Sequence, residues 1–87
     1  MIHRLFTVYD QKAEVYLLPF TEKTIPAAIR LFSDTVQDEK HQFHRHAEDF
    51  TLFELGSYND YNASYELLDT PRAVIKAIEL LNQENGK

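Results

Sequence analysis

The chain changes its hydrophobic period at Thr24, and this change constrains the fold strongly. Before it, residues 2–10 (IHRLFTVYD) and 13–20 (AEVYLLPF) are rich in β-branched and aromatic residues, which is typical of strands. After it, apolar residues recur with the spacing of one face of an amphipathic helix. These residues are Ile25, Ala28, Ile29, Phe32 and Val36. Thr24 is a suitable N-cap and Pro26 is tolerated in the first turn, so the pattern predicts a helix that ends near residues 37–39.

The second half of the chain repeats this plan. Residues 50–58 (FTLFELGSY) and 64–69 (SYELLD) predict two more strands, and residues 59–63 between them have the composition of a turn. Thr70-Pro71 suits an N-cap followed by the first helical position, so we expect the second helix to begin there. That helix would carry Val74, Ile75, Ile78 and Leu81 on one side and end in a frayed polar tail at 82–87.

The predicted order is therefore β-β-α-β-β-α, with each pair of strands forming a hairpin. This order belongs to the α+β class and predicts an antiparallel sheet with two helices packed on one face. A chain of 87 residues has room for one modest core, so we expect a single domain over residues 1–87. Pro19 cannot donate to a strand ladder, which predicts an edge position or the end of the second strand.

The composition excludes several classes of protein. There is no cysteine, which rules out disulfides, thiolate catalysis and zinc–thiolate sites. No apolar run is long enough to span a bilayer, and the polar residues of MIHRLFTVYD do not fit a secretory signal. The net charge is −5 and the basic residues are scattered, which argues against strong nonspecific binding to nucleic acid.

The segment HQFHRHAEDF, residues 41–50, has the composition of a metal site because it combines three histidines with two carboxylates. It could also sense pH, since histidine titrates near neutrality. A third interpretation is structural: Glu48 or Asp49 caps backbone N–H groups and Phe43 holds the loop against the core. We favour the structural interpretation and predict no metal site, because an arginine interrupts the histidines and only His3 could add an imidazole from elsewhere.

Catalytic motifs are absent from the sequence. Gly56 and Gly86 are the only glycines, so there is no glycine-rich phosphate loop. The three serines do not lie in a nucleophile-elbow context. We therefore expect a protein that is not an enzyme, with no catalytic residues and no cofactor.

Five tyrosines lie in or beside the predicted hairpins, where one face of the sheet would have no helix over it. They could pack their rings with the hydroxyl in water, form a protein interface, or stack on the bases of single-stranded DNA. The candidate nucleic-acid site combines three of these tyrosines with basic residues of the first hairpin. It consists of Arg4, Tyr9, Lys12, Tyr16 and Tyr58.

Four stretches taken together resemble one small family: LFTVYDQKAEVYLLPF, AAIRLFSDTVQD, HQFHRHAEDFTLFELGSYND and LLDTPRAVIKAIE. The family is the non-structural protein of gokushovirus-type microviruses, which are phages with circular single-stranded DNA genomes. The resemblance runs from about Leu5 to Glu79. The family's histidine segment is closer to HPEDY, so Ala47 and Phe50 depart from it.

The resemblance implies a bacteriophage protein of the Microviridae that acts in the host bacterial cytoplasm and is not part of the mature capsid. It would correspond to the coliphage protein that turns duplex DNA replication to single-strand synthesis and DNA packaging. Because the chain is acidic, we expect it to act mainly through protein contacts, with the replication initiator or a procapsid protein as partner. The alternative is direct DNA-binding to single strands through an aromatic sheet face. The default assembly for so small a domain with strand edges to cover is a homodimer.

Overall fold

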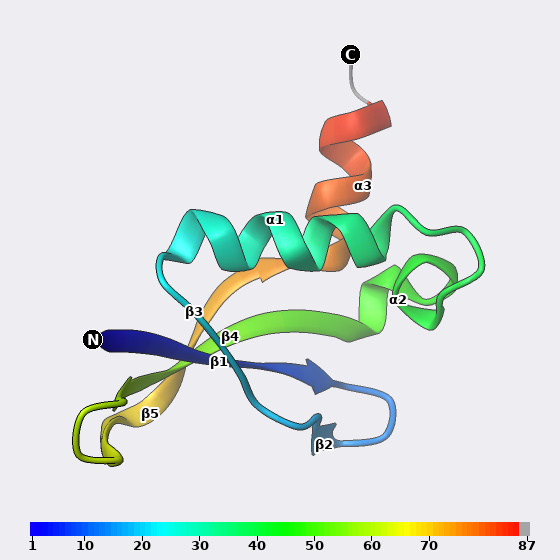
Figure 1. The fold of residues 1–87 in the computed structure, drawn as a ribbon. Helices are drawn as coiled ribbons and strands as arrows, with labels where there is room; N and C mark the ends of the chain where they lie inside the picture. Colours follow the sequence, from blue (N-terminus) through cyan, green and yellow to red (C-terminus); the bar gives the residue numbers. More distant parts are fainter. Residues whose placement is uncertain (86–87) are drawn as a thin grey trace.

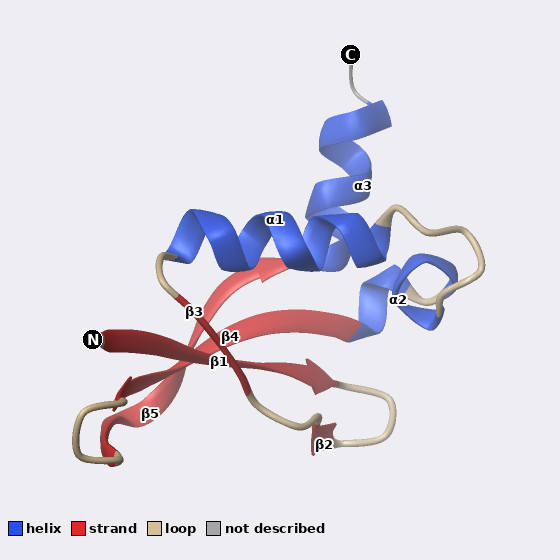
Figure 2. Ribbon diagram, in the orientation of Figure 1, coloured by secondary structure: helices blue, strands red, loops and turns tan. Residues whose placement is uncertain are grey.

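The structure, a computed structural model, describes residues 1–85 as a curled antiparallel sheet with the helices on one face (Figures 1 and 2). The strands are β1 (Ile2–Asp10), β2 (Val15–Tyr16), β3 (Phe20–Glu22), β4 (Phe50–Asn59) and β5 (Ser64–Lys76). The helices are α1 (Ile25–Val36), α2 (Gln42–Arg45) and α3 (Ala77–Asn85), with a 3₁₀ turn, η1 (Ala47–Asp49), before β4. The predicted α+β class and the antiparallel sheet are confirmed.

Strand β1 lies in the interior of the sheet. It pairs with β2 and β3 along one edge and with β4 along the other, and β4 pairs in turn with β5. The β1–β4 ladder extends from Ile2 opposite Asn59 to Asp10 opposite Phe50. All of these pairings are antiparallel. Because β1 belongs to the first half of the sequence and β4 to the second, the ladder between them joins the two halves of the chain into one sheet.

The predicted strand at residues 13–20 is divided into two short strands. β2 contains two residues, and pairing with β1 resumes only after Pro19, in β3. Between them the Thr7 hydroxyl donates to the Leu17 carbonyl at 2.6 Å, and Leu17 N–H donates to the Val8 carbonyl at 2.8 Å. Pro19 marks an interruption of the ladder, as its missing N–H requires.

Helix α1 begins as the sequence predicts. The Thr24 hydroxyl accepts a hydrogen bond from Ala27 N–H at 3.2 Å, and Pro26 lies in the first turn. The helix ends at Val36, slightly before the expected limit, and it buries Ala28, Phe32 and Val36 against the sheet.

The predicted start of the last helix at Pro71 is wrong. Strand β5 continues to Lys76, with Arg72 paired to Glu54 and Ile75 paired to Leu52. An edge strand tolerates proline because its outer N–H groups have no strand to bond. Helix α3 begins at Ala77, where the Glu79 carboxylate accepts from Lys76 N–H at 3.1 Å.

The frayed polar tail predicted for residues 82–87 overlaps the end of helix α3. Helix α3 continues to Asn85, so residues 82–85 are helical, and residues 86–87 lie outside the described part of the chain.

The core lies under the helices at one end of an elongated molecule with extents of 42 × 27 × 21 Å. Its strand residues come from the second half of β1 and the first half of β4. The buried core residues are Phe6, Val8, Ala28, Phe32, Val36, Phe43, Ala47, Phe50, Leu52, Ala77 and Leu80. The first half of β1, the second half of β4 and the β4–β5 hairpin extend beyond the helices (Figure 1). This leaves part of the sheet with solvent on both faces.

Candidate functional site

The β4–β5 hairpin is exposed along most of its length. Every residue from 60 to 73 is exposed, including the large apolar side chains of Tyr65, Leu67 and Leu68. Within the described residues β5 pairs only with β4, so its outer edge presents backbone N–H and C=O groups without a strand partner. An exposed edge that also carries apolar side chains is suited to pairing with another chain.

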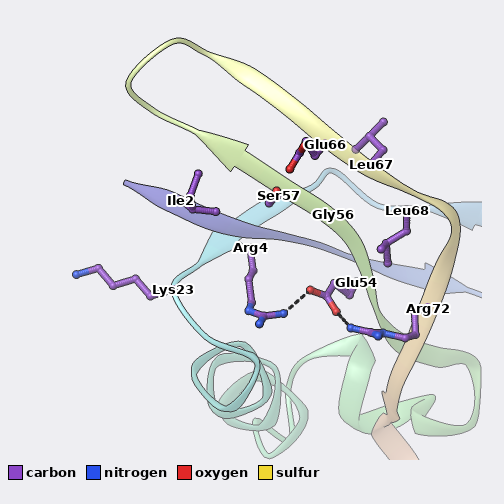
Figure 3. A pocket seen from close by; sticks show the side chains of 10 residues that line it. All are labelled: Ile2, Arg4, Lys23, Glu54, Gly56, Ser57, Glu66, Leu67, Leu68 and Arg72. Carbon is purple, nitrogen blue, oxygen red and sulfur yellow. Dashed lines mark hydrogen bonds and ion pairs between the residues drawn. The ribbon is translucent and has the colours of Figure 1, made fainter.

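Midway along this hairpin, β5 arches away from β4. Gly56 is paired with Leu67 and Glu54 with Arg72, so the four residues Leu68–Pro71 of β5 stand opposite Leu55 alone. Such a bulge bends the strand and opens the ladder locally. A cavity of about 430 Å³ lies beside it, and we call it the arginine cavity (Figure 3). It is lined by Ile2, Arg4, Lys23, Glu54, Gly56, Ser57, Glu66, Leu67, Leu68 and Arg72.

A buried carboxylate holds two arginines at this cavity. Glu54 is only 4% exposed, and its Oε2 accepts from Arg4 Nη1 at 2.8 Å while its Oε1 accepts from Arg72 Nη2. Figure 3 shows both arginine side chains reaching Glu54 from opposite sides. A buried carboxylate is stable only when it is paired, and here both of its oxygens are. The side chains of Arg4 and Arg72 remain 45% and 61% exposed, so other N–H groups of each guanidinium face solvent.

The cavity is a locally basic region of an acidic chain. Three cations line it, Arg4, Lys23 and Arg72, against the two carboxylates Glu54 and Glu66. The chain as a whole carries a net charge of −5. The excess positive charge at the cavity therefore favours an anionic group. Because the excess is a single charge, a group with one negative charge balances it.

Gly56 brings β4 and β5 together next to the cavity. Its φ is +153°, a backbone conformation that residues with a side chain rarely adopt. A Cβ at this position would lie 2.7 Å from the Leu67 Cα and would also meet the Glu66 carbonyl oxygen. The close approach of the two strands therefore depends on glycine.

The opposite face of the sheet carries an aromatic cluster, and none of the helices within residues 1–85 covers it (Figure 1). The ring centroids of Tyr9 and Tyr16 are 4.6 Å apart, and Phe53 lies 5.7 Å from Tyr16 and 6.3 Å from Tyr9. Further along the same face, the rings of Tyr58 and Tyr65 are 4.9 Å apart. Cross-strand aromatic pairs of this kind stabilise a sheet, so part of this surface already packs against itself.

The predicted nucleic-acid residues are divided between the two faces. Arg4 lies on the helix side, in ion contact with Glu54. Tyr9, Tyr16 and Tyr58 lie on the other side, because side chains alternate along a strand. Lys12 lies in the turn after β1, where its backbone N–H donates to an Asp10 side-chain oxygen at 3.0 Å. The structure thus brings together Tyr9 and Tyr16 but separates both from Arg4.

The histidine segment forms the crossing from α1 to β4. His41 Nδ1 accepts from Phe43 N–H at 3.1 Å and caps α2, while the ring of His44 hydrogen-bonds to the Val36 carbonyl at 3.0 Å. Phe43 is buried against Phe50, which confirms its predicted role in holding the loop. Among residues 1–85, η1 has no side-chain cap and Asp49 accepts from Gln11 N–H through its backbone carbonyl, so the prediction that Glu48 or Asp49 caps this crossing is wrong. No group of three potential metal ligands occurs in this part of the chain.

Replacing His41 with alanine is expected to lower the free energy of unfolding by about 1 kcal/mol, the usual cost of losing a helix cap. Urea denaturation measures this loss. His46→Ala is the matched control because His46 is exposed and its side chain caps neither α2 nor η1. Equal stability of the two variants would contradict a capping role for His41.

Asp60 lies at the end of the β1–β4 ladder and forms ion pairs with residues at the start of the chain. The N-terminal ammonium of Met1 donates to Asp60 Oδ1 at 2.7 Å, and His3 Nε2 lies 2.8 Å from Oδ2. The hydrogen bond from the ammonium, followed by that from His3, lowers the pKa of the Asp60 carboxyl below its ordinary value of 3.8.

Because the folded pKa of Asp60 is depressed, its stabilising contribution is complete above pH 3.8 and is lost as the pH falls through the folded pKa. We expect Asp60→Asn to unfold at lower urea concentration than the wild type near neutral pH, and the difference to vanish in strong acid. Asp34→Asn, on the exposed side of α1, is the control. A difference that persists unchanged in strong acid would contradict the assignment.

Sequence reasoning missed the residues that form the arginine cavity, apart from Arg4. A signal was present in Glu54, which shares the inward register of Phe50 and Leu52 in β4. A carboxylate at a buried strand position requires a cationic partner. The partner Arg72 was hidden because the prediction placed it in a helix.

The comparison with known families matches residues 3–80 to the family described as Phage ORF5 protein. The chain belongs to the Phage ORF5 protein family. No curated protein and no solved structure shows a significant match to it. Within residues 1–85, the helices are too short or too polar to cross a bilayer.

Proposed function

We propose that this phage protein is a non-enzymatic regulator of genome replication, which acts through protein contacts to turn duplex replication to single-strand synthesis and packaging. The observation that carries the proposal is the hairpin β4–β5, with exposed residues 60–73 and an outer strand edge that no other strand of the described residues pairs with. The partners we propose are the replication initiator or a procapsid protein, in the host bacterial cytoplasm. The resemblance to gokushovirus non-structural proteins supports this role.

Capture of named phage proteins tests the proposal. Tagged protein is incubated with lysate of infected cells, and the initiator and capsid proteins are quantified in the bound fraction by mass spectrometry. Leu67→Asp should reduce their recovery roughly tenfold, because it charges an exposed apolar contact. Leu18→Asp is the control, since Leu18 is 90% exposed and lies between β2 and β3. Recovery of neither protein with the wild type would overturn the proposal.

A second candidate function, binding of single-stranded DNA, is supported by the charge distribution of the sheet. The carboxylates at paired positions belong to the helix side: Asp10, Glu22, Glu54 and Glu66. Within residues 1–85, no carboxylate occupies a paired position on the aromatic face. Bases could stack on this face without facing the negative charge of the chain as a whole.

Fluorescence polarisation with a labelled oligothymidine at low and moderate salt tests this candidate. Binding should weaken steeply with salt. Tyr16→Ala should weaken it by about 1–3 kcal/mol, the cost of losing one stacked base. Tyr61→Ala is the control because Tyr61 lies in the turn between β4 and β5 and is 91% exposed. No binding at low salt excludes the candidate.

We also propose that the protein is a homodimer, because the outer edge of β5 could pair with the same edge of a second copy. Sedimentation velocity across a range of concentrations tests this proposal. A monomer at every concentration would exclude it.

A further inference from the structure

We infer that the arginine cavity is a socket for an acidic side chain of a partner protein, a carboxylate that enters beside an aliphatic neighbour. The inference rests on the proposed function, since it assigns chemistry to the surface through which we propose that partners bind. It concerns the face of the sheet opposite to the aromatic cluster.

The charges of the cavity fit one carboxylate. Arg4, Lys23 and Arg72 exceed the two lining carboxylates by a single positive charge. One incoming carboxylate balances that charge, whereas a chain of phosphates would meet Glu54 and Glu66 with an excess of negative charge. Arginine also presents its donors in a planar fork that matches the two oxygens of a carboxylate.

The two arginines are held in position before any ligand arrives. Glu54 is buried and accepts one hydrogen bond from each, Arg4 from β1 and Arg72 from β5. Each guanidinium is therefore already held by Glu54, and little side-chain conformational entropy is lost when its remaining N–H groups bind a ligand. The wild-type arrangement is preorganised in a way that exposed, unpaired arginines are not.

The walls of the cavity favour a protein over a nucleic acid. The apolar lining comes from the aliphatic residues Ile2 and Leu68, with Leu67 next to Leu68 in β5, and none of the lining residues is aromatic. A base would find nothing to stack on, whereas an aliphatic side chain next to the carboxylate would find apolar contacts. Ile2 and Leu67 are 57% and 66% exposed, so the apolar surface continues outside the cavity and a partner could cover it.

Chemical-shift mapping by ¹⁵N NMR tests the inference with defined probes. The wild-type protein is titrated with a short acetylated and amidated peptide that contains a central Glu-Leu pair among threonines and valines. The control peptide has Gln-Leu instead. We expect the Glu peptide to shift the Nε–H signals of Arg4 and Arg72 and the amides of Leu67 and Leu68. We expect the Gln peptide to bind roughly tenfold more weakly, because the charge-assisted hydrogen bonds are lost.

A pair of lysine variants locates the binding on the protein. Lys23 lines the cavity and is exposed, so Lys23→Gln should fold normally and bind the Glu peptide several-fold more weakly. Lys40→Gln carries the same change of charge on an exposed loop residue outside the cavity and should bind as the wild type does. Equal binding by the two variants would overturn the inference.

Three other outcomes would also overturn the inference. Neither peptide shifts any signal, or the shifts are confined to the Tyr9–Tyr16–Phe53 cluster. In the third outcome, inorganic phosphate or oligothymidine shifts the cavity signals at a lower concentration than the Glu peptide does. These outcomes are separate from a failure of the proposed function. If Lys23→Gln captures initiator or capsid protein as well as the wild type does, the socket is refuted and the proposed function stands. If the wild type captures neither phage protein, the proposed function fails whatever the peptide does.

Discussion

Replacing Gly56 with alanine is expected to lower the free energy of unfolding by about 3 kcal/mol. Two costs combine at this position. The backbone must hold a φ of +153°, which is strained for alanine, and the new Cβ must be accommodated against the backbone of β5. Because the obstructing atoms belong to backbone, no side chain can rotate away to relieve the contact.

Denaturation in guanidinium chloride, followed by far-UV circular dichroism, measures this loss. Ser57→Ala is the matched control: it lies at the next position of β4, and alanine there shortens an existing side chain. We expect its stability to remain within about 1 kcal/mol of the wild type, as for most substitutions of partly exposed residues. A Gly56→Ala protein as stable as the control would mean that β4 and β5 do not approach closely at this point.

The elements that the sequence predicts well are those whose pattern is complete within one segment. β1 follows from its β-branched and aromatic residues, and α1 follows from the spacing Ile25 to Val36 together with the Thr24 cap. Each of these signals is local, and the surrounding structure reinforces it. For this reason the α+β class and the antiparallel sheet could be predicted without the structure.

The start of α3 could not be predicted because its local signals fit two structures. Thr70-Pro71 suits the first turn of a helix, but it also suits an edge strand that bonds on one side only. Val74 and Ile75 are β-branched and therefore also favour a strand. The decision rests on β4, whose residues Leu52 and Glu54 pair with Ile75 and Arg72. The sequence of residues 70–76 alone does not show that these residues pair with β4.

The arginine cavity could not be predicted either, because the residues that form it are far apart in the sequence. Arg4 and Glu54 are 50 residues apart in the chain, and Glu54 and Arg72 are 18 apart. Their meeting depends on the β1–β4 register and on the bulge at Leu68–Pro71. Both features arise only when the sheet is assembled. The aromatic cluster was easier to anticipate, since Tyr9 and Tyr16 flank one short turn.

The double variant Arg4→Met/Arg72→Met is expected to lower the free energy of unfolding by about 3–5 kcal/mol. Methionine keeps the aliphatic length of each side chain but removes both partners of Glu54, whose side chain is only 5% exposed. An ionised carboxylate left buried without a partner costs this amount in proteins, whereas loss of exposed charges alone does not.

Adding Glu54→Leu to the double variant separates the two explanations. If the loss comes from the stranded carboxylate, leucine removes its cause and the triple variant should recover most of the stability, because a buried ion cluster can often be replaced by apolar residues at little cost. Arg30→Met/Arg45→Met removes the same charge from exposed positions on α1 and α2 and should stay within about 1 kcal/mol of the wild type. A triple variant no more stable than the double would show that Arg4 and Arg72 stabilise the sheet through contacts of their own. The buried carboxylate would then not be what holds the two guanidiniums at the cavity.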